Sequence, residues 1–179
     1  MKNEKTMRLI TIFLLLILIS SCGIKEDKKS QSEESTKKEY LQKGQDIVKL
    51  SQGELLKNVS SAMKAGGPAY AVEFCNVRAI SIKDSLSEKY NCEIRRIATK
   101  YRNPVDMPQT ETEKSQLEKY MHAFQQGDSL KPKVYMTGES VEYYQPILLN
   151  NAACLLCHGT PGEQISEETL ALIKTKYPD

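Results

Sequence analysis

Three residues near the C-terminal end of the chain combine two thiols and an imidazole at a fixed spacing. Cys154, Cys157 and His158 form a C-x-x-C-H motif, the attachment signature of c-type haem. The thiols lie one short turn apart, so they can add across the two vinyl groups of one porphyrin. The adjacent imidazole then lies beneath the iron as an axial ligand. The motif predicts one covalently bound haem c.

Other uses of these side chains find less support. A structural zinc site needs four ligands, usually in two separated pairs, and the sequence has no second pair. A thioredoxin-like cysteine pair is not expected to be followed by His158 and Gly159. No Ser-His-Asp set or carboxylate pair is discernible. The only other histidine, His122, has polar neighbours at helical spacing and is expected on a solvated face. We therefore do not expect an enzyme.

The first residues have the pattern of an export signal. A basic start precedes an apolar run over residues 9–19, which is too short to span a bilayer comfortably. Ser20 and Ser21 then precede Cys22, as in a bacterial lipobox. We expect residues 1–21 to be a lipoprotein signal peptide and Cys22 to be lipidated. The alternative is a plain signal peptide cut near Ser21. Either places the protein in the bacterial cell envelope on the periplasmic side, with the outer surface as an alternative.

The net charge of +2 belongs to the signal peptide, which carries three Lys/Arg and one Glu. The remaining chain is formally neutral, so nucleic-acid binding is not expected. The segment 25–39 contains no apolar residue and cannot bury surface. We predict a disordered tether over residues 22–39 and a haem-binding domain over residues 40–179.

Hydrophobic spacing predicts the elements of that domain. Two helices are separated by Gly66-Gly67-Pro68, and the second ends near Tyr90. The remaining predicted elements are a strand over 91–100, a helix over 111–126 with Leu117, Met121 and Phe124 inward, strands over 133–137 and 141–149, and a helix over 166–176. This order predicts an α+β fold in which N-terminal helices pack on one face of a sheet.

Three segments together resemble the Tll-like c-type haem domain family. They are the helix sequence Ala71-Val72-Glu73-Phe74-Cys75, the Arg102-Asn103-Pro104 loop with Pro108, and the haem motif with Gly159. The resemblance implies a PAS-like fold with an antiparallel sheet. It also implies a six-coordinate haem whose axial ligands are His158 and Cys75.

The residues alone leave alternatives for the sixth ligand. Periodicity says only that Cys75 faces the core, where it could equally be a small buried residue or form a disulfide with Cys92 in an oxidising compartment. Methionines are also haem ligands, and Met107, in a loop, is the best placed of Met63, Met107, Met121 and Met136. Arg102 either pairs with a haem propionate or is a solvated loop residue.

Two function classes fit these expectations. The first is a membrane-anchored monohaem cytochrome that carries electrons or senses redox state. The second is a gas or small-ligand sensor in which a ligand displaces the weaker axial group. The expected partners are membrane lipid, through the anchor, and a redox or signalling protein that the sequence does not identify.

Overall fold

The computed structural model describes residues 23–138 and 140–178, without the side chains of residues 23–30 and 76–80. The expected signal peptide and the lipidation site Cys22 lie outside the described residues. Within the described part, none of the helices combines the length and the apolar character needed to cross a membrane.

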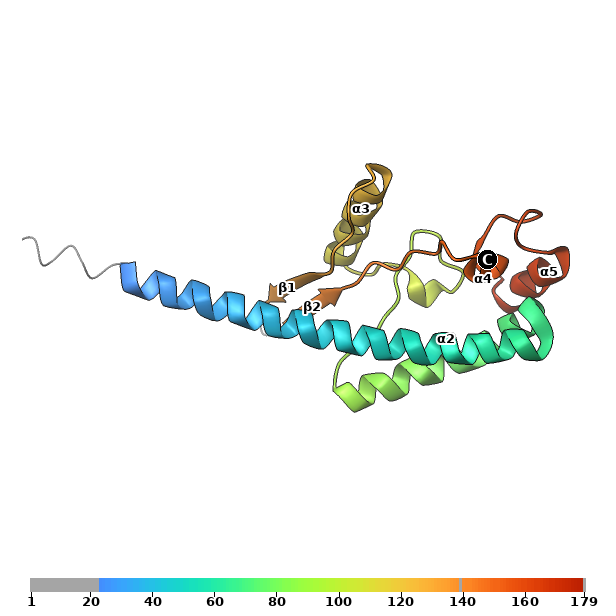
Figure 1. Ribbon diagram of the computed structural model, residues 1–179, viewed down its shortest axis with the longest axis horizontal. Coiled ribbons are helices and arrows are strands. Elements are labelled where there is room, and N and C mark those ends of the chain that lie inside the picture. The colour runs from blue at the N-terminus through green and yellow to red at the C-terminus, as the bar shows by residue number, and fades with distance from the viewer. Residues whose placement is uncertain (1–22, 139, 179) are drawn as a thin grey trace, which may run out of the picture.

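The long element α2 (Gly23–Tyr90) is two helical arms joined by a sharp turn, and the second arm reverses direction in Figure 1. The turn is at Gly66 and Gly67, which have non-helical dihedral angles. Gly67 has φ 73°, in the left-handed region that favours glycine. Pro68 then starts the second arm, where a missing N–H costs nothing. The predicted break between two helices is confirmed. We call residues 23–65 the first arm and residues 68–90 the second arm.

The start of the first arm corrects the expected disordered tether. Residues 25–39 are helical, although nearly all described side chains there are exposed. Lysine and glutamate are good helix formers, and contacts four residues apart support them. Lys43 pairs with Glu39 in this way at 2.6 Å. Lack of apolar residues excluded burial here, but it did not exclude a solvated helix.

A β-hairpin lies against α2. Strands β1 (Lys133–Thr137) and β2 (Ser140–Tyr144) pair antiparallel, and the turn between them contains Gly138 with φ 60°. Both strands contact α2. The ring of Tyr143 lies so close to Gly44 of the first arm that a Cβ atom there would overlap it. The second strand is shorter than predicted, because residues 145–149 pair with no strand in the described structure.

Helix α3 (Glu111–Gln125) forms where it was predicted, but it faces a different way. Its fully buried residue is Gln116, which is 2% exposed. Leu117 is half-buried, whereas Met121 and Phe124 are 40% and 61% exposed, so their predicted inward position is wrong. The helix meets the hairpin through hydrogen bonds rather than through this apolar face.

The predicted strand over residues 91–100 does not form. This segment has no regular secondary structure. The Ala98 N–H donates to the Asp106 carbonyl at 3.0 Å, and Asp106 ends the short 3-10 helix η2 (Pro104–Asp106). The backbone N–H of this segment is therefore bonded to η2 and not to a neighbouring strand.

The C-terminal helices pack near the turn of α2 (Figure 1). Helices α4 (Ala152–His158) and α5 (Glu167–Lys176) both contact α2. The core between them is a small cluster of Val72, Ile165 and Ile173, each at most 6% exposed. The α+β class is confirmed: helices pack on a small antiparallel sheet, which has two strands in the described residues.

Candidate functional site

Helix α4 carries the whole C-x-x-C-H motif. The Asn151 side chain caps it by accepting from the Ala153 N–H at 2.8 Å. Cys154 and Cys157 are half-buried and lie three residues apart, so they share one face of the helix. His158 is the last residue of the helix. The local fold therefore presents both thiols together, with the imidazole at the helix end.

Gly159 follows the motif for a steric reason. A Cβ atom there would lie 2.5 Å from the Leu155 carbonyl oxygen and 2.7 Å from Oε1 of Gln164. The Gly159 N–H donates to the same Leu155 carbonyl at 2.9 Å, and Gln164 Oε1 accepts from the Thr160 N–H at 2.6 Å. These close contacts, rather than an unusual φ, require glycine and hold the end of α4 in place.

Arg102 reaches the motif from a distant loop. Its guanidinium donates to the carbonyl of Cys157, and its side chain is half-buried. Asn103 shapes this loop by accepting from the Val105 N–H at 3.2 Å. Two of the three segments singled out in the sequence, the Arg-Asn-Pro loop and the cysteine motif, are thus in direct contact.

Cys75 comes to the same region from the second arm of α2. Val72, one turn earlier, belongs to the buried cluster, and both Cys157 and Tyr177 pack against that cluster. The Cys75 thiol is half-buried. Burial raises its pKa, the nearby Cys157 thiol raises it further, and the Arg96 guanidinium opposes both. All three segments therefore converge at one end of the molecule.

The disulfide alternative for Cys75 is not realised. Cys75 and Cys92 are both free thiols, as are Cys154 and Cys157. Burial raises the pKa of the half-buried Cys92, which lies beyond the end of α2. The structure leaves Cys75 available as a ligand or as a packed core residue.

His158 is set up as a neutral base. Its side chain keeps exposed surface, yet the surrounding atoms lower its pKa by desolvation. The positive charges of Arg102 and Arg96 lower the pKa further. A pKa below the ordinary 6.5 leaves the imidazole unprotonated at neutral pH, and an unprotonated ring nitrogen is the form that binds a metal.

The surroundings of the motif fit a haem better than a bare metal ion. In residues 23–138 and 140–178, no three His, Cys, Asp or Glu residues are grouped to hold an ion. A haem requires only axial ligands from the protein, together with apolar side chains that cover the ring. Exposed apolar residues occur in the loop that holds Arg102 and in the segment leading into α4, namely Tyr101, Val105, Met107, Ile147, Leu148 and Leu149.

The other ligand candidates are placed less favourably. His122 is exposed on α3, as predicted. Met121 and Met136 are exposed on α3 and β1, whereas Met63 is half-buried on the first arm. Met107 follows η2, and its Sδ accepts from the Tyr101 hydroxyl at 3.3 Å.

Sequence reasoning missed two residues at this site. Burial raises the pKa of Cys75 and lowers that of His158, and the charge of Arg96 adds a smaller lowering effect to each. Tyr177, just after α5, packs on the buried cluster, and burial raises its pKa. The double arginine Arg95-Arg96 was visible in the sequence, but nothing local indicated which way either side chain points.

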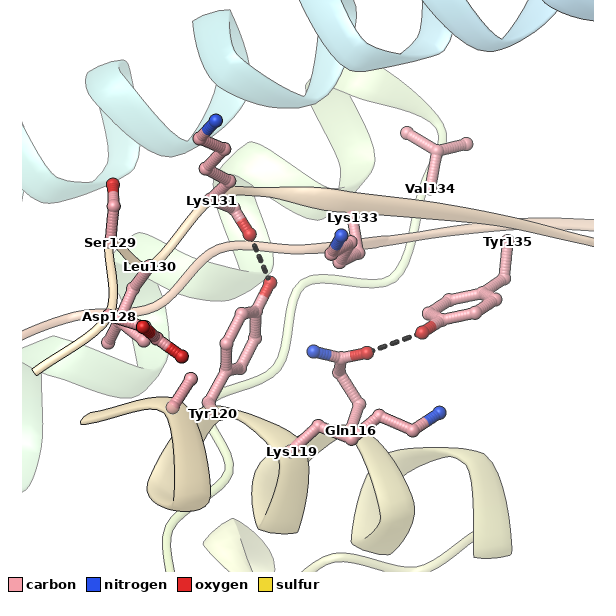
Figure 2. A pocket seen from close by; sticks show the side chains of 11 residues that line it. Gln116, Lys119, Tyr120, Asp128, Ser129, Leu130, Lys131, Lys133, Val134 and Tyr135 are labelled. Carbon is pink, nitrogen blue, oxygen red and sulfur yellow. Dashed lines mark hydrogen bonds between the residues drawn. The ribbon is translucent and has the colours of Figure 1, made fainter. Parts of the chain in front are cut away.

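A separate groove of about 700 Å³ lies between α3 and β1 (Figure 2). The Tyr135 hydroxyl donates to Gln116 Oε1 at 2.5 Å, and the Tyr120 hydroxyl donates to the Lys131 carbonyl at 3.0 Å. Burial, with smaller effects from nearby tyrosines, raises the pKa of Tyr120 to about 12. None of the residues lining this groove belongs to the cysteine motif, so the chemistry and the groove are in different places.

With this geometry established, comparison with known proteins identifies the family. The profile of the Tll0287-like family matches residues 25–179, so the chain belongs to that family. The match includes Cys75, the Arg102 loop and the whole C-x-x-C-H motif. No curated protein and no solved structure matches the chain.

Proposed function

We propose that this chain is an exported, membrane-anchored monohaem c-type cytochrome that transfers electrons or senses redox state. The observation that carries the proposal is the motif itself: two free thiols on one face of α4, followed by an imidazole whose pKa is lowered. When bound, haem supplies one-electron exchange at iron. Cys154 and Cys157 hold it covalently, and His158 provides one axial nitrogen.

Cys75 is the second axial ligand in this proposal. The convergence of the second arm of α2 with α4 supports it, as does the closeness of the Cys75 thiol to Cys157. The family resemblance points to the same residue. Metal binding deprotonates a thiol outright, so a raised pKa in the free protein does not prevent ligation as thiolate. Arg102 supports the site by donating to the Cys157 carbonyl, and its remaining donors would pair with a haem propionate.

The decisive experiment measures covalent attachment. The full chain is expressed with haem c maturation machinery, and its mass is compared before and after acid-acetone extraction. We expect one haem that resists extraction, and loss of that haem in the Cys154→Ala/Cys157→Ala double variant. Cys92→Ala is the matched control, because it also removes a half-buried thiol but should keep the haem. Haem that extracts freely from the wild-type protein contradicts the proposal.

The anchor is tested separately. Cys22→Ser should abolish lipid attachment, and the protein should then move from the detergent phase to the aqueous phase on separation. Stable anchoring requires more than one acyl chain, as in a mature lipoprotein. A native protein found in the aqueous phase would contradict the lipoprotein assignment without affecting the haem proposal.

A gas or small-ligand sensor is the second candidate. The observation that favours it is the raised pKa of Cys75, which favours the neutral thiol, a weaker ligand than thiolate. On reduction, Cys75 would leave the iron more easily and open a site for CO or NO. A sensor of this kind transmits its state to a signalling partner. Absorption spectra of both oxidation states, with and without CO, distinguish the two candidates. The spectra of a sensor should change when CO is added, whereas those of an electron carrier should not.

A further inference from the structure

The first arm of α2 separates the candidate haem site from the N-terminal end of the described chain. In Figure 1 this arm runs along the long axis of the molecule, and α4 and α5 lie near its far end, beside the turn. Both of these helices contact α2. An α-helix rises about 1.5 Å per residue, so residues 23–65 span about 60 Å. The cysteine motif therefore lies most of the length of the first arm away from Gly23.

The N-terminal part of the first arm projects into solvent. In Figure 1 the blue beginning of α2 extends beyond the hairpin. Every side chain of residues 31–40 is exposed, except the half-buried Thr36. The hairpin packs on the arm further along, where the Tyr143 ring lies against Gly44. The segment before Tyr40 is therefore a projecting helix and not a part of the packed domain.

The charges of this projecting helix are spaced to stabilise it. Glu33, Glu34 and Glu39 are each followed four residues later by a lysine, with the glutamate on the favourable N-terminal side. Lys43 is the last of these partners and pairs with Glu39 at 2.6 Å. The helix continues without a break to residue 65, so the packed part of the arm supplies the nucleus from which the projecting part extends. A helix stabilised in this way is stiff.

The same segment has neither of the features that hold a helix on a lipid surface. A helix that lies in the membrane interface needs an apolar face, and a basic polar face attracts it to anionic headgroups. Residues 25–39 contain no apolar side chain, and their five lysines are balanced by five Asp or Glu residues. A neutral helix that is polar on all sides is most stable in water. The arm should therefore extend away from the membrane.

We propose that the first arm is a rigid spacer that holds the haem far from the lipid headgroups, and that the haem exchanges electrons with a water-soluble redox protein and not with a lipid-soluble quinone. This role rests on the proposed haem attachment at Cys154 and Cys157 and on the proposed lipid anchor at Cys22. In each encounter one electron passes between the haem iron and the partner's redox centre, so one is oxidised as the other is reduced. Electron transfer slows steeply with distance, which puts a quinone confined to the bilayer out of range.

The height of the protein above the lipid tests the spacer. Neutron reflectometry measures it for the lipidated, haem-loaded full chain on a supported bilayer. Deletion of residues 25–39 should lower the protein layer by about 20 Å, the length of the helix removed. Three Glu-Ala-Ala-Ala-Lys repeats in place of residues 25–39 are the matched control, because they keep the length and the helix and should leave the height unchanged. Three Gly-Gly-Gly-Gly-Ser repeats keep the length but not the stiffness, so the layer should become broader and lower.

Stopped-flow kinetics with two probes test the partner. A small water-soluble cytochrome in its ferric form should oxidise the reduced protein equally fast in the wild type and in the deletion variant. A quinol confined to lipid vesicles gives one electron to each of two haems and releases two protons. This quinol should reduce the oxidised wild type slowly and the deletion variant faster, because the deletion brings the haem closer to the bilayer.

The outcomes separate the spacer from the proposed function. Equal heights in the wild type and the deletion variant overturn the spacer, and equally fast reduction of both by the quinol overturns the choice of partner. Either result leaves the covalent haem in place. A wild-type protein without haem contradicts the proposed function and the partner, whereas the height measurement still tests the spacer. A wild-type protein that does not stay on the bilayer contradicts both the anchor and the spacer.

Discussion

The two ends of the molecule are stabilised in different ways. At the hairpin end, α3 and the strands meet through tyrosine hydrogen bonds, and the buried Gln116 accepts from Tyr135. At the motif end, an apolar cluster of Val72, Ile165 and Ile173 joins the second arm of α2 to the C-terminal segments. Among the described residues, Cys75, Cys154, Cys157 and His158 gather around this second cluster.

At the hairpin end, the tyrosine hydroxyl groups form hydrogen bonds within the protein. The Tyr120 hydroxyl lies within hydrogen-bonding distance of two carbonyl oxygens, that of Lys131 at 3.0 Å and that of Tyr144 at 3.2 Å. In the part of the chain that the structure describes, no buried side-chain nitrogen or oxygen lacks a partner. Such satisfied buried groups stabilise the fold.

The motif end keeps groups available. Its thiols are free, the imidazole of His158 is neutral at neutral pH, and Arg96 forms no salt bridge with a described residue. The contrast teaches that substitutions at this end should change the cofactor chemistry, whereas substitutions at the hairpin end should change only the stability.

The sharpest test is Cys75→Ser in the haem-loaded protein. A thiolate is an anionic donor that stabilises ferric iron, so its removal should eliminate the low-spin thiolate signal in electron paramagnetic resonance and raise the reduction potential. Cys92→Ser is the control and should leave the spectrum unchanged, because that thiol lies outside the motif region. An unaltered signal in Cys75→Ser would show that Cys75 is a packed core residue and not a ligand.

Gln116→Ala should destabilise the hairpin end without changing the haem spectrum. The substitution removes the acceptor for the Tyr135 hydroxyl and leaves a small cavity in a site that is 2% exposed. The expected loss in the free energy of unfolding is about 2 kcal/mol. Gln125→Ala, at an exposed position of the same helix, should have little effect. Equal losses in both variants, measured by denaturant titration, would contradict the role of the buried amide.

Two glycines of the first arm make a matched pair. In Gly44→Ala, the new Cβ would overlap the Tyr143 ring, and the displaced hairpin should cost about 1–2 kcal/mol of stability. In Gly53→Ala, the new Cβ meets nothing within 4 Å, and the helix should gain about 0.5–1 kcal/mol. Opposite signs in thermal unfolding are expected. Stabilisation by Gly44→Ala would mean that the hairpin does not pack on the first arm as described.

Thr110→Ala should have the smallest effect. The Thr110 hydroxyl accepts from the Glu113 N–H at 3.1 Å, and Glu113 Oε2 accepts from the Thr110 N–H at 3.1 Å, which is a capping box. Loss of the cap should cost about 1 kcal/mol. Thr110→Ser keeps the hydroxyl and should retain most of the stability. Chemical denaturation of both variants measures the difference, and an equal loss in both would show that the hydroxyl does not stabilise α3.

Local sequence determined the features that depend on neighbouring residues. The break at Gly66-Gly67-Pro68 follows from the freedom of glycine and the fixed φ of proline, so it was predictable. The spacing of Cys154 and Cys157 puts both thiols on one face of a helix, and the helix over them needs only a local cap. The predicted helices over 111–126 and 166–176 formed within a residue of their expected bounds for the same reason.

Tertiary structure decided what depends on distant residues. Arg102 and Cys157 are 55 positions apart, and only the folded chain brings the guanidinium to that carbonyl. Residues 91–100 have a strand-like sequence, but a strand requires a neighbour, and η2 took its place. Apolar spacing placed Phe124 inward, whereas the hydrogen bond from Tyr135 turned Gln116 inward instead. Hydrophobic periodicity cannot predict such a hydrogen bond, because the bond depends on two residues that are distant in the sequence and not on the residue type at either position.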